Sequence, residues 1–226
     1  MKKTVAILLC VLLFCSLSIT AFAENSLSFA DKNLIELENS NSAYFFGKIE
    51  NTGDQPVGIG RGKLVAFSEK DDILVTENYV SSLPSGILLQ PGEYAYVYES
   101  IYENVLNDSD IADYKVSMEA ENDPDEVTKI PCEAEFVSDG SYDHDVWVTF
   151  TNTTEDVLFD AYITVAMYDT EGTLVCVDGG ELDDIGVFPG STITVKVYVD
   201  HDLVEYYAAN GIEIGVVDAL VYKLAD

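Results

Sequence analysis

Two histidines, each set between two aspartates, are the residues best suited to metal or acid–base chemistry. They form Asp143-His144-Asp145 and Asp200-His201-Asp202. Imidazole nitrogens and carboxylate oxygens are both metal ligands. Adjacent side chains on a strand point to opposite faces, however, so one tripeptide alone cannot chelate a metal well. We therefore expect solvated turn residues here, unless the fold brings the two tripeptides together.

Cys132 and Cys176 are the two cysteines that lie outside the N-terminal region. An even number of cysteines in an exported chain is typical of a disulfide, although sequence alone does not show whether the two sulfurs meet. A thiol beside a histidine could also act as a nucleophile. No local signature of a cysteine or serine enzyme accompanies these residues. The sequence therefore predicts a protein that is not an enzyme, and it leaves the disulfide open.

A cluster of acids near the middle of the chain is the strongest candidate for a bound cation. Asp123, Asp125 and Glu126 lie in the stretch NDPDE, and their oxygens are ligands that calcium prefers. The stretch lacks the glycine and the terminal glutamate of the twelve-residue calcium loop. A calcium-dependent structural module with its metal at this position is thus an alternative function. Otherwise no cofactor is expected.

The N-terminus has the pattern of a secretory signal peptide. Two lysines precede an apolar run, and Ala21-Phe22-Ala23 is a small-x-small cleavage pattern. We expect residues 1–23 to be removed and the mature chain to be secreted, with no membrane insertion after cleavage. The chain has 11 basic and 41 acidic side chains, a formal net charge of −30. Such a surface repels phosphate backbones, which excludes nucleic acid as a partner.

The remaining chain contains an internal sequence repeat. Residues 45–52 align with residues 146–153 at an offset of 101, and residues 63–67 align with residues 164–168 at the same offset. A Pro-Gly pair follows in each half, at an offset of 98. Landmarks in the same order at nearly constant spacing indicate an internal duplication.

Each copy has the pattern of an all-β domain. Apolar residues alternate with polar ones over residues 146–151 and 192–199, which indicates strands with one buried face. Turn residues separate about seven short strands per half, and this spacing is typical of an immunoglobulin-like β-sandwich. We predict two tandem domains, residues 24–126 and 127–226, placed end to end by a short acidic linker. The glycine-rich residues 58–63 are expected to form a loop.

One strand of the first copy has an aromatic face. Tyr94, Tyr96 and Tyr98 lie opposite the core positions of their strand, and Phe46 is expected nearby. Aromatic side chains on a flat sheet can form a patch for a protein or glycan partner. Tyrosines also form strands and pair across them well, so the same residues could be structural. The sequence leaves both interpretations open.

A short motif in the second copy resembles a known bacterial group. VAMYD, residues 165–169, follows FTNTTEDVL and resembles the extracellular FxLYD-type domain, named for its Phe-x-Leu-Tyr-Asp signature. Val165 and Met167 replace the phenylalanine and leucine of the signature, and the first copy has LVAFS at residues 64–68. The resemblance implies an immunoglobulin-like module from a secreted protein of a Gram-positive bacterium. It implies no catalytic residue.

Together these features predict a secreted, non-enzymatic binding or scaffold protein of the bacterial cell envelope. Its partner is expected to be an envelope protein or a glycan, contacted by Tyr94, Tyr96, Tyr98 and Phe46. The sequence does not identify that partner.

Overall fold

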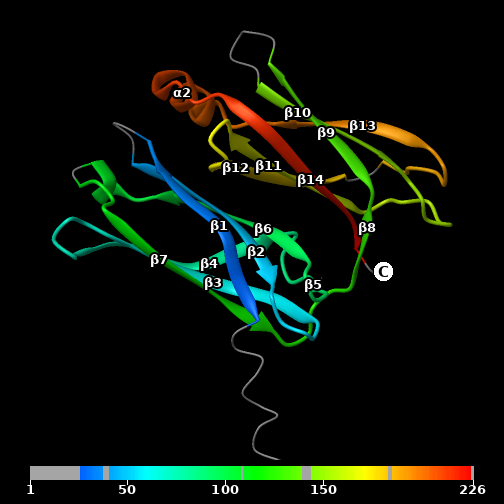
Figure 1. Ribbon diagram of the computed structural model, residues 1–226, viewed down its shortest axis with the longest axis horizontal. Coiled ribbons are helices and arrows are strands. Elements are labelled where there is room, and N and C mark those ends of the chain that lie inside the picture. The colour runs from blue at the N-terminus through cyan, green and yellow to red at the C-terminus, as the bar shows by residue number, and fades with distance from the viewer. Residues whose placement is uncertain (1–25, 38–40, 108, 139–143, 183–184, 225–226) are drawn as a thin grey trace, which may run out of the picture.

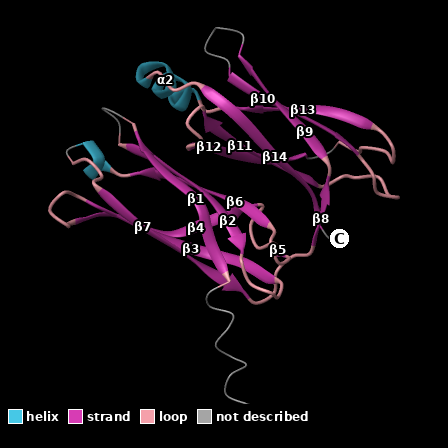
Figure 2. Ribbon diagram, viewed as in Figure 1, coloured by secondary structure: helices cyan, strands magenta, loops and turns pink. Residues whose placement is uncertain are grey.

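The computed structural model describes residues 26–37, 41–107, 109–138, 144–182 and 185–224. The fold is all-β, with antiparallel sheets packed as in a sandwich, as the sequence predicted (Figure 1, Figure 2). The predicted signal peptide, residues 1–23, lies outside the described residues. Among the described residues, no helix has the length and apolarity needed to cross a membrane.

The strands of the first half form one curled seven-stranded sheet. Its order is β1-β2-β6-β4-β3-β5, and β7 pairs with β3. The bounds are β1 Leu27–Glu36, β2 Ser42–Asn51, β3 Val57–Phe67, β4 Ile73–Leu83, β5 Leu88–Leu89, β6 Tyr94–Tyr102 and β7 Asp113–Glu121. Alternate residues of β2 and β6, among them Phe45 and Val97, point inward and pack against β3 and β4. This alternation is what the period of two in the sequence predicts.

The second half contains two sheets with the orders β13-β10-β9 and β12-β11-β14-β8. The bounds are β8 Val127–Ile130, β9 Cys132–Ser138, β10 His144–Thr151, β11 Ala161–Asp169, β12 Leu174–Leu182, β13 Thr192–Tyr198 and β14 Ile214–Leu224. Val148 of β10 and Val165 of β11 are among the core residues between the two sheets. The core is therefore built from strand faces, as in the first half.

The two halves share most of their strand pairing. β1-β2-β6 corresponds to β9-β10-β13, and β3 with its neighbours β4 and β7 corresponds to β11 with β12 and β14. Val57 pairs with Leu89, and Leu158 forms an antiparallel bridge with Val187, the same pairing at the two offsets found in the sequence. Gly92 has a φ of 78° and Gly190 a φ of 76°. The equivalent Pro-Gly turns require this positive φ at the glycine.

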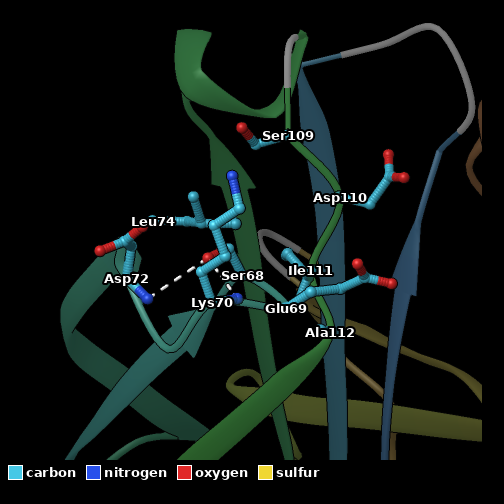
Figure 3. A pocket seen from close by; sticks show the side chains of 9 residues that line it. All are labelled: Ser68, Glu69, Lys70, Asp72, Leu74, Ser109, Asp110, Ile111 and Ala112. Carbon is cyan, nitrogen blue, oxygen red and sulfur yellow. Dashed lines mark hydrogen bonds between the residues drawn. The ribbon is translucent and has the colours of Figure 1, made fainter.

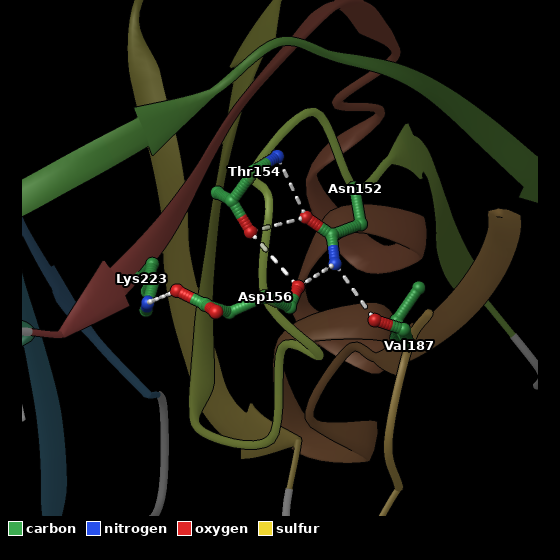
Figure 4. A network of polar contacts seen from close by, with 5 residues as sticks. All are labelled: Asn152, Thr154, Asp156, Val187 and Lys223. Carbon is green, nitrogen blue, oxygen red and sulfur yellow. Dashed lines mark hydrogen bonds and ion pairs between the residues drawn. The ribbon is translucent and has the colours of Figure 1, made fainter. Parts of the chain in front are cut away.

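A buried asparagine ends the same strand in each half. Asn51 and Asn152 have no exposed surface. The Asn152 amide donates to the carbonyls of Asp156 and Val187 at 2.8 and 2.7 Å, and its Oδ1 accepts from the backbone of Thr154 at 2.9 Å (Figure 4). Asn51 makes the equivalent three hydrogen bonds. Each asparagine thus holds its turn against the Pro-Gly segment of the same half.

Several predicted boundaries differ from the structure. Residues 58–63 lie inside β3 rather than in a loop, because their backbone pairs with β5, β4 and β7. The only α-helix among the described residues is α2, His201–Asn210, which Asp200 and Gly211 cap. A 3₁₀ turn, η1 (Asn104–Asn107), occupies the corresponding place in the first half.

The halves do not lie end to end; they pack face to face. One core cluster contains Tyr44, Phe46 and Tyr96 of the first half together with core residues of the second half. In Figure 1 the outer face of β1-β2-β6 lies beside β11, β12 and β14. We call this buried contact the joint. The division into two tandem immunoglobulin-like domains, residues 24–126 and 127–226, stays a prediction.

The segment between the halves is held on both sides. Asp125 forms a parallel bridge with Ile87 of the first half. Two residues later β8 begins, and it pairs with β14 over Val221–Leu224. Backbone hydrogen bonds to both halves leave this linker little freedom. The molecule is therefore a stack of sheets with one internal joint.

Candidate functional site

The tyrosine face of β6 is buried in the joint, so the prediction of an exposed binding patch there is wrong. Tyr96 and Phe46 have no exposed surface, and Tyr94 and Tyr98 are half-buried. The sequence pattern indicated correctly that these side chains share one face. It did not show that the second half covers that face.

Asp218 of β14 is the polar centre of the joint. The hydroxyls of Tyr94 and Tyr96 both donate to its Oδ2, each at 2.7 Å. Tyr96 also shares a hydrogen bond with the hydroxyl of Tyr168, at 3.3 Å. Burial, followed by these hydrogen bonds, raises the pKa of Tyr96 far above its ordinary value. The tyrosines therefore stay neutral donors, and their role is structural.

The predicted calcium ligands do not converge. Asp123, Asp125 and Glu126 are all exposed, and the backbone of Asp125 is used for strand pairing with the first half. In the part of the chain that the structure describes, no three His, Cys, Asp or Glu side chains form a group able to hold a metal. The linker is stiffened by hydrogen bonds, and the calcium alternative stays a prediction without a convergent group of side-chain ligands among the described residues.

His144 lies next to Asp200-His201-Asp202, whereas Asp143 lies outside the described residues. The amide of Val199 donates to the carbonyl of His144 at 3.2 Å, so the segments are neighbours. Asp200 caps α2 by accepting from the amide of Asp202 at 2.9 Å. His201 pairs with Glu205 one turn along the helix, at 3.3 Å. Asp200 therefore acts as a helix N-cap, and His201 takes part in an i,i+4 pair on the helix surface.

Cys132 and Cys176 are free thiols, so the disulfide that the sequence left open is absent. Cys132 lies on β9 and donates to the carbonyl of Ala219 at 3.3 Å. Cys176 lies on β12, in the other sheet of the same half, and is buried. Burial, together with the nearby charge of Asp178, raises the pKa of the Cys176 thiol well above its ordinary value.

We expect the Cys176 thiol of the folded protein to resist labelling. A protonated, buried thiol is a poor nucleophile. Reaction of the mature protein with a thiol reagent at pH 8 should modify Cys176 at least about 100-fold more slowly than in urea. Two thiols per chain should react after unfolding without reductant. Finding no thiol in the unfolded, unreduced protein would contradict the structure.

A hollow of about 360 Å³ lies beside the hairpin turn between β3 and β4 (Figure 3). Ser68 shapes its wall, because its Oγ accepts from the amides of Lys70 and Asp72 at 3.2 and 3.3 Å. The remaining lining residues are Glu69, Leu74, Ser109, Asp110, Ile111 and Ala112. Carboxylates and one lysine surround an open space, and nothing in this arrangement resembles a nucleophile with its base.

The outward side of β9-β10-β13 carries the exposed aromatic side chains of the second half's outer sheet. Trp147 is 45% exposed and Tyr198 is 68% exposed. Lys196 lies directly across from Trp147 in the ladder, and its Nζ lies 4.5 Å from the centre of the Tyr198 ring. We call this surface the tail face. It consists of Glu133, Glu135, Trp147, Thr149, Thr151, Thr192, Thr194, Lys196 and Tyr198.

Asp145 lies under the tail face. It is 6% exposed, and its Oδ2 contacts the Nζ of Lys196 at 2.6 Å. Its second carboxylate oxygen has no hydrogen-bond partner among the described residues. Such a buried acceptor normally finds a donor in water or in a ligand. The tail face therefore offers two aromatic rings, a cation and an open acceptor close together.

A second outward surface lies on the opposite outer sheet. Arg61 and Lys63 of β3 point outward, and Lys115 of β7 pairs with their strand. Arg61 lies over the exposed ring of Tyr79 at 5.1 Å, and Lys115 lies over Phe67 at 5.2 Å. We call this surface the head face. It consists of Arg61, Lys63, Val65, Phe67, Thr76, Tyr79, Asp113, Lys115, Ser117 and Glu119.

The sequence prediction missed both faces. The alternation over residues 146–151 predicts a strand with one buried face, which fits the outward side chain of Trp147, but the sequence-based binding patch lies on the first half. Arg61 and Lys63 were placed in a loop, where side chains have no fixed direction. The signal that could have found them is the alternation of charged residues along residues 59–67.

No protein-family model matches the chain, and no curated protein matches it. The resemblance to FxLYD-type domains therefore stays a prediction. Among solved structures, the crystal structure of red sea bream transglutaminase is similar over 88% of this chain, with 10% sequence identity and a TM-score of 0.29. The chain spans only 29% of that structure's length. A likeness of this degree supports no inference about activity.

Proposed function

We propose that this protein is an exported, non-enzymatic binding or scaffold protein that contacts a macromolecular partner through its tail face. The observation that carries the proposal is the exposure of Trp147 and Tyr198 on the outward side of a flat sheet. Large aromatic side chains are the commonest anchors of binding surfaces, because each ring loses much water at a small cost in rotamer entropy. The envelope of a Gram-positive bacterium is the setting that we propose.

The surroundings of the two rings support recognition of a polar surface. Two threonine pairs lie on the sheet beside the rings. The hydroxyls of Thr149 and Thr194 are hydrogen-bonded at 2.8 Å, and those of Thr151 and Thr192 at 2.7 Å. Glu135 lies directly across from Trp147 on the other side. An aromatic centre with a hydrogen-bonding rim has the composition of a transient interface. An envelope protein or a glycan is a partner of matching chemistry.

The double variant Trp147→Ala/Tyr198→Ala tests the proposal. The mature protein is titrated onto isolated Gram-positive cell-wall material and onto solubilised envelope proteins, and binding is measured by depletion from solution. We expect the double variant to bind at least about 10-fold more weakly, since anchor residues typically contribute more than about 1 kcal/mol each. Its melting temperature should stay within about 3 °C of wild type, because both rings are exposed.

Phe188→Ala is the matched control, since Phe188 is an aromatic residue of the second half that is 66% exposed and lies off the tail face. It should leave binding unchanged. Wild-type binding that survives the loss of Trp147 and Tyr198 would reject the tail face as the contact surface.

A further inference from the structure

Each half of the molecule has two outward sheet faces, and the joint uses one face from each half. The first half contributes the outer face of β1-β2-β6, and the second half contributes the outer face of β11-β12-β14. Because the halves repeat one another, the two unused faces are the repeat equivalents of the faces in the joint. The tail face corresponds to the outer face of β1-β2-β6, and the head face corresponds to that of β11-β12-β14.

The correspondence is residue by residue. Phe46 pairs with Tyr98 in the first half, and Trp147 pairs with Lys196 in the second. On the other face, Ala166 pairs with Asp218, and Val65 pairs with Lys115. Lys115 therefore takes the place on the head face that Asp218, the acceptor for two tyrosines, takes in the joint.

We propose that the tail face of one copy docks on the head face of a second copy, in the way that the first half docks on the second half within the chain. The proposal rests on the proposed function, because it names the partner of the tail face. The joint supplies the geometry, and charged side chains take the place of its tyrosine–aspartate hydrogen bonds. The two faces lie on the two outer sheets, on opposite sides of the stack (Figure 1).

Charge complementarity supports this pairing. The tail face carries Glu133 and Glu135 against one cation, Lys196. The head face carries Arg61, Lys63 and Lys115 against two acids, Asp113 and Glu119, so the two faces have opposite net charges. In a chain with only 11 basic residues, three on one face make it the natural acceptor of an acidic surface.

The joint also predicts which strands meet. Asn33 of β1 donates to the carbonyl of Leu174, at the start of β12, at 2.9 Å. The equivalent residues are Glu135 on β9, paired to Trp147 as Asn33 is paired to Phe46, and Ile73 at the start of β4. β9 with its two glutamates is thus expected to lie beside β4 and β3 of the second copy.

Exposed apolar side chains on both faces would be covered by the same contact. Tyr79 is 66% exposed and Ile73 is 64% exposed on β4. Trp147 and Tyr198 lie on the facing surface. Tyr79 already contacts Arg61, and Tyr198 already contacts Lys196. Removing water from these pairs would strengthen their cation–π contacts.

The contact should be weaker than the joint. Thr192 and Thr194 stand where the joint has Tyr94 and Tyr96, and their hydroxyls already pair with Thr151 and Thr149. The net charge of −30 also opposes association, although a Debye length of about 8 Å at physiological salt limits this repulsion. A head-to-tail contact leaves one free head and one free tail, so it generates an open chain rather than a closed dimer.

Analytical ultracentrifugation of the mature protein at about 0.15 M salt, from about 10 µM to 1 mM, tests the proposal. The weight-average mass should rise with concentration and pass that of a dimer without a plateau. A head variant, Lys63→Glu/Lys115→Glu, and a tail variant, Glu135→Lys/Trp147→Ala, should each associate at least 10-fold more weakly alone. Lys70→Glu, an exposed turn residue off both faces, controls for added negative charge and should change association less than twofold.

Mixing the two variants gives the sharpest result. The head variant keeps an intact tail face, and the tail variant keeps an intact head face, so one molecule of each should form a dimer. The two faces left over in that dimer are the mutated ones, so the dimer should not grow. A wild-type protein that stays monomeric at 1 mM, or one that stops at a dimer, would overturn head-to-tail docking. If it stays monomeric yet binds envelope material through Trp147 and Tyr198, the proposed function holds without this partner; if that binding survives their loss, the proposed function fails separately.

Discussion

Replacing Tyr96 by alanine is expected to lower the free energy of unfolding by about 4 kcal/mol, the usual cost of removing a large buried aromatic side chain. Tyr96 has no exposed surface, and its ring lies in the core cluster that both halves share. Its loss opens a cavity in the joint and removes one of two donors to Asp218. Urea denaturation monitored by circular dichroism measures the change.

Two controls separate the contributions. Tyr96→Phe keeps the ring and removes the hydroxyl, so about 1–2 kcal/mol of the loss should remain. Thr194→Ala alters the repeat-equivalent position on the exposed tail face, where the expected change is within about 0.5 kcal/mol. If Tyr96→Ala lowers the free energy of unfolding by less than about 1 kcal/mol, the tyrosine face is not buried. That result would support the sequence-based prediction of an accessible patch.

Replacing Asn152 by alanine is expected to lower the free energy of unfolding by about 3 kcal/mol, because three backbone groups lose their hydrogen bonds to the Asn152 side chain, one of these bonds being fully buried. These are the carbonyls of Asp156 and Val187 and the amide of Thr154. Asn51→Ala should cost a similar amount, since Asn51 makes the equivalent three bonds in the first half. Chemical denaturation of both variants checks the prediction.

The matched control is an asparagine without this environment. Asn78 on β4 is exposed, and its replacement by alanine should change the free energy of unfolding by less than about 0.5 kcal/mol. Similar effects at Asn51 and Asn152 support the structural equivalence of the halves. A large effect at only one of them would mean that the two turns differ in construction.

The repeat and its register could be read from the sequence because they depend on local rules. Turn residues and strand periodicity act within a few residues, and the structure's pairs Val57 with Leu89 and Leu158 with Val187 differ by the same two offsets, 101 and 98. Asn51 and Asn152 begin stretches rich in turn-forming residues, NTGD and NTTED, which act equally locally. Their burial depends on the Pro-Gly segment that folds back over them.

The joint could not be read from the sequence, because a period of two identifies a strand's faces but not what covers them. Tyr94, Tyr96 and Tyr98 have hydroxyls that suit either water or a buried acceptor. The acceptor, Asp218, lies more than 100 residues away in the chain. The same limit applies to Cys132 and Cys176, whose placement in different sheets depends on the tertiary fold.

We expect the buried tyrosine–aspartate joint to hold the two halves together as one rigid body. Electron–electron double resonance between spin labels at Glu69→Cys and Glu155→Cys, two exposed turn positions in different halves, tests it most directly. Cys132→Ser and Cys176→Ala remove the native thiols, and dilute protein avoids association. A rigid joint should give a single narrow distance distribution, which broadens when Tyr96→Ala is added. A broad distribution in the protein that retains Tyr96 would contradict it.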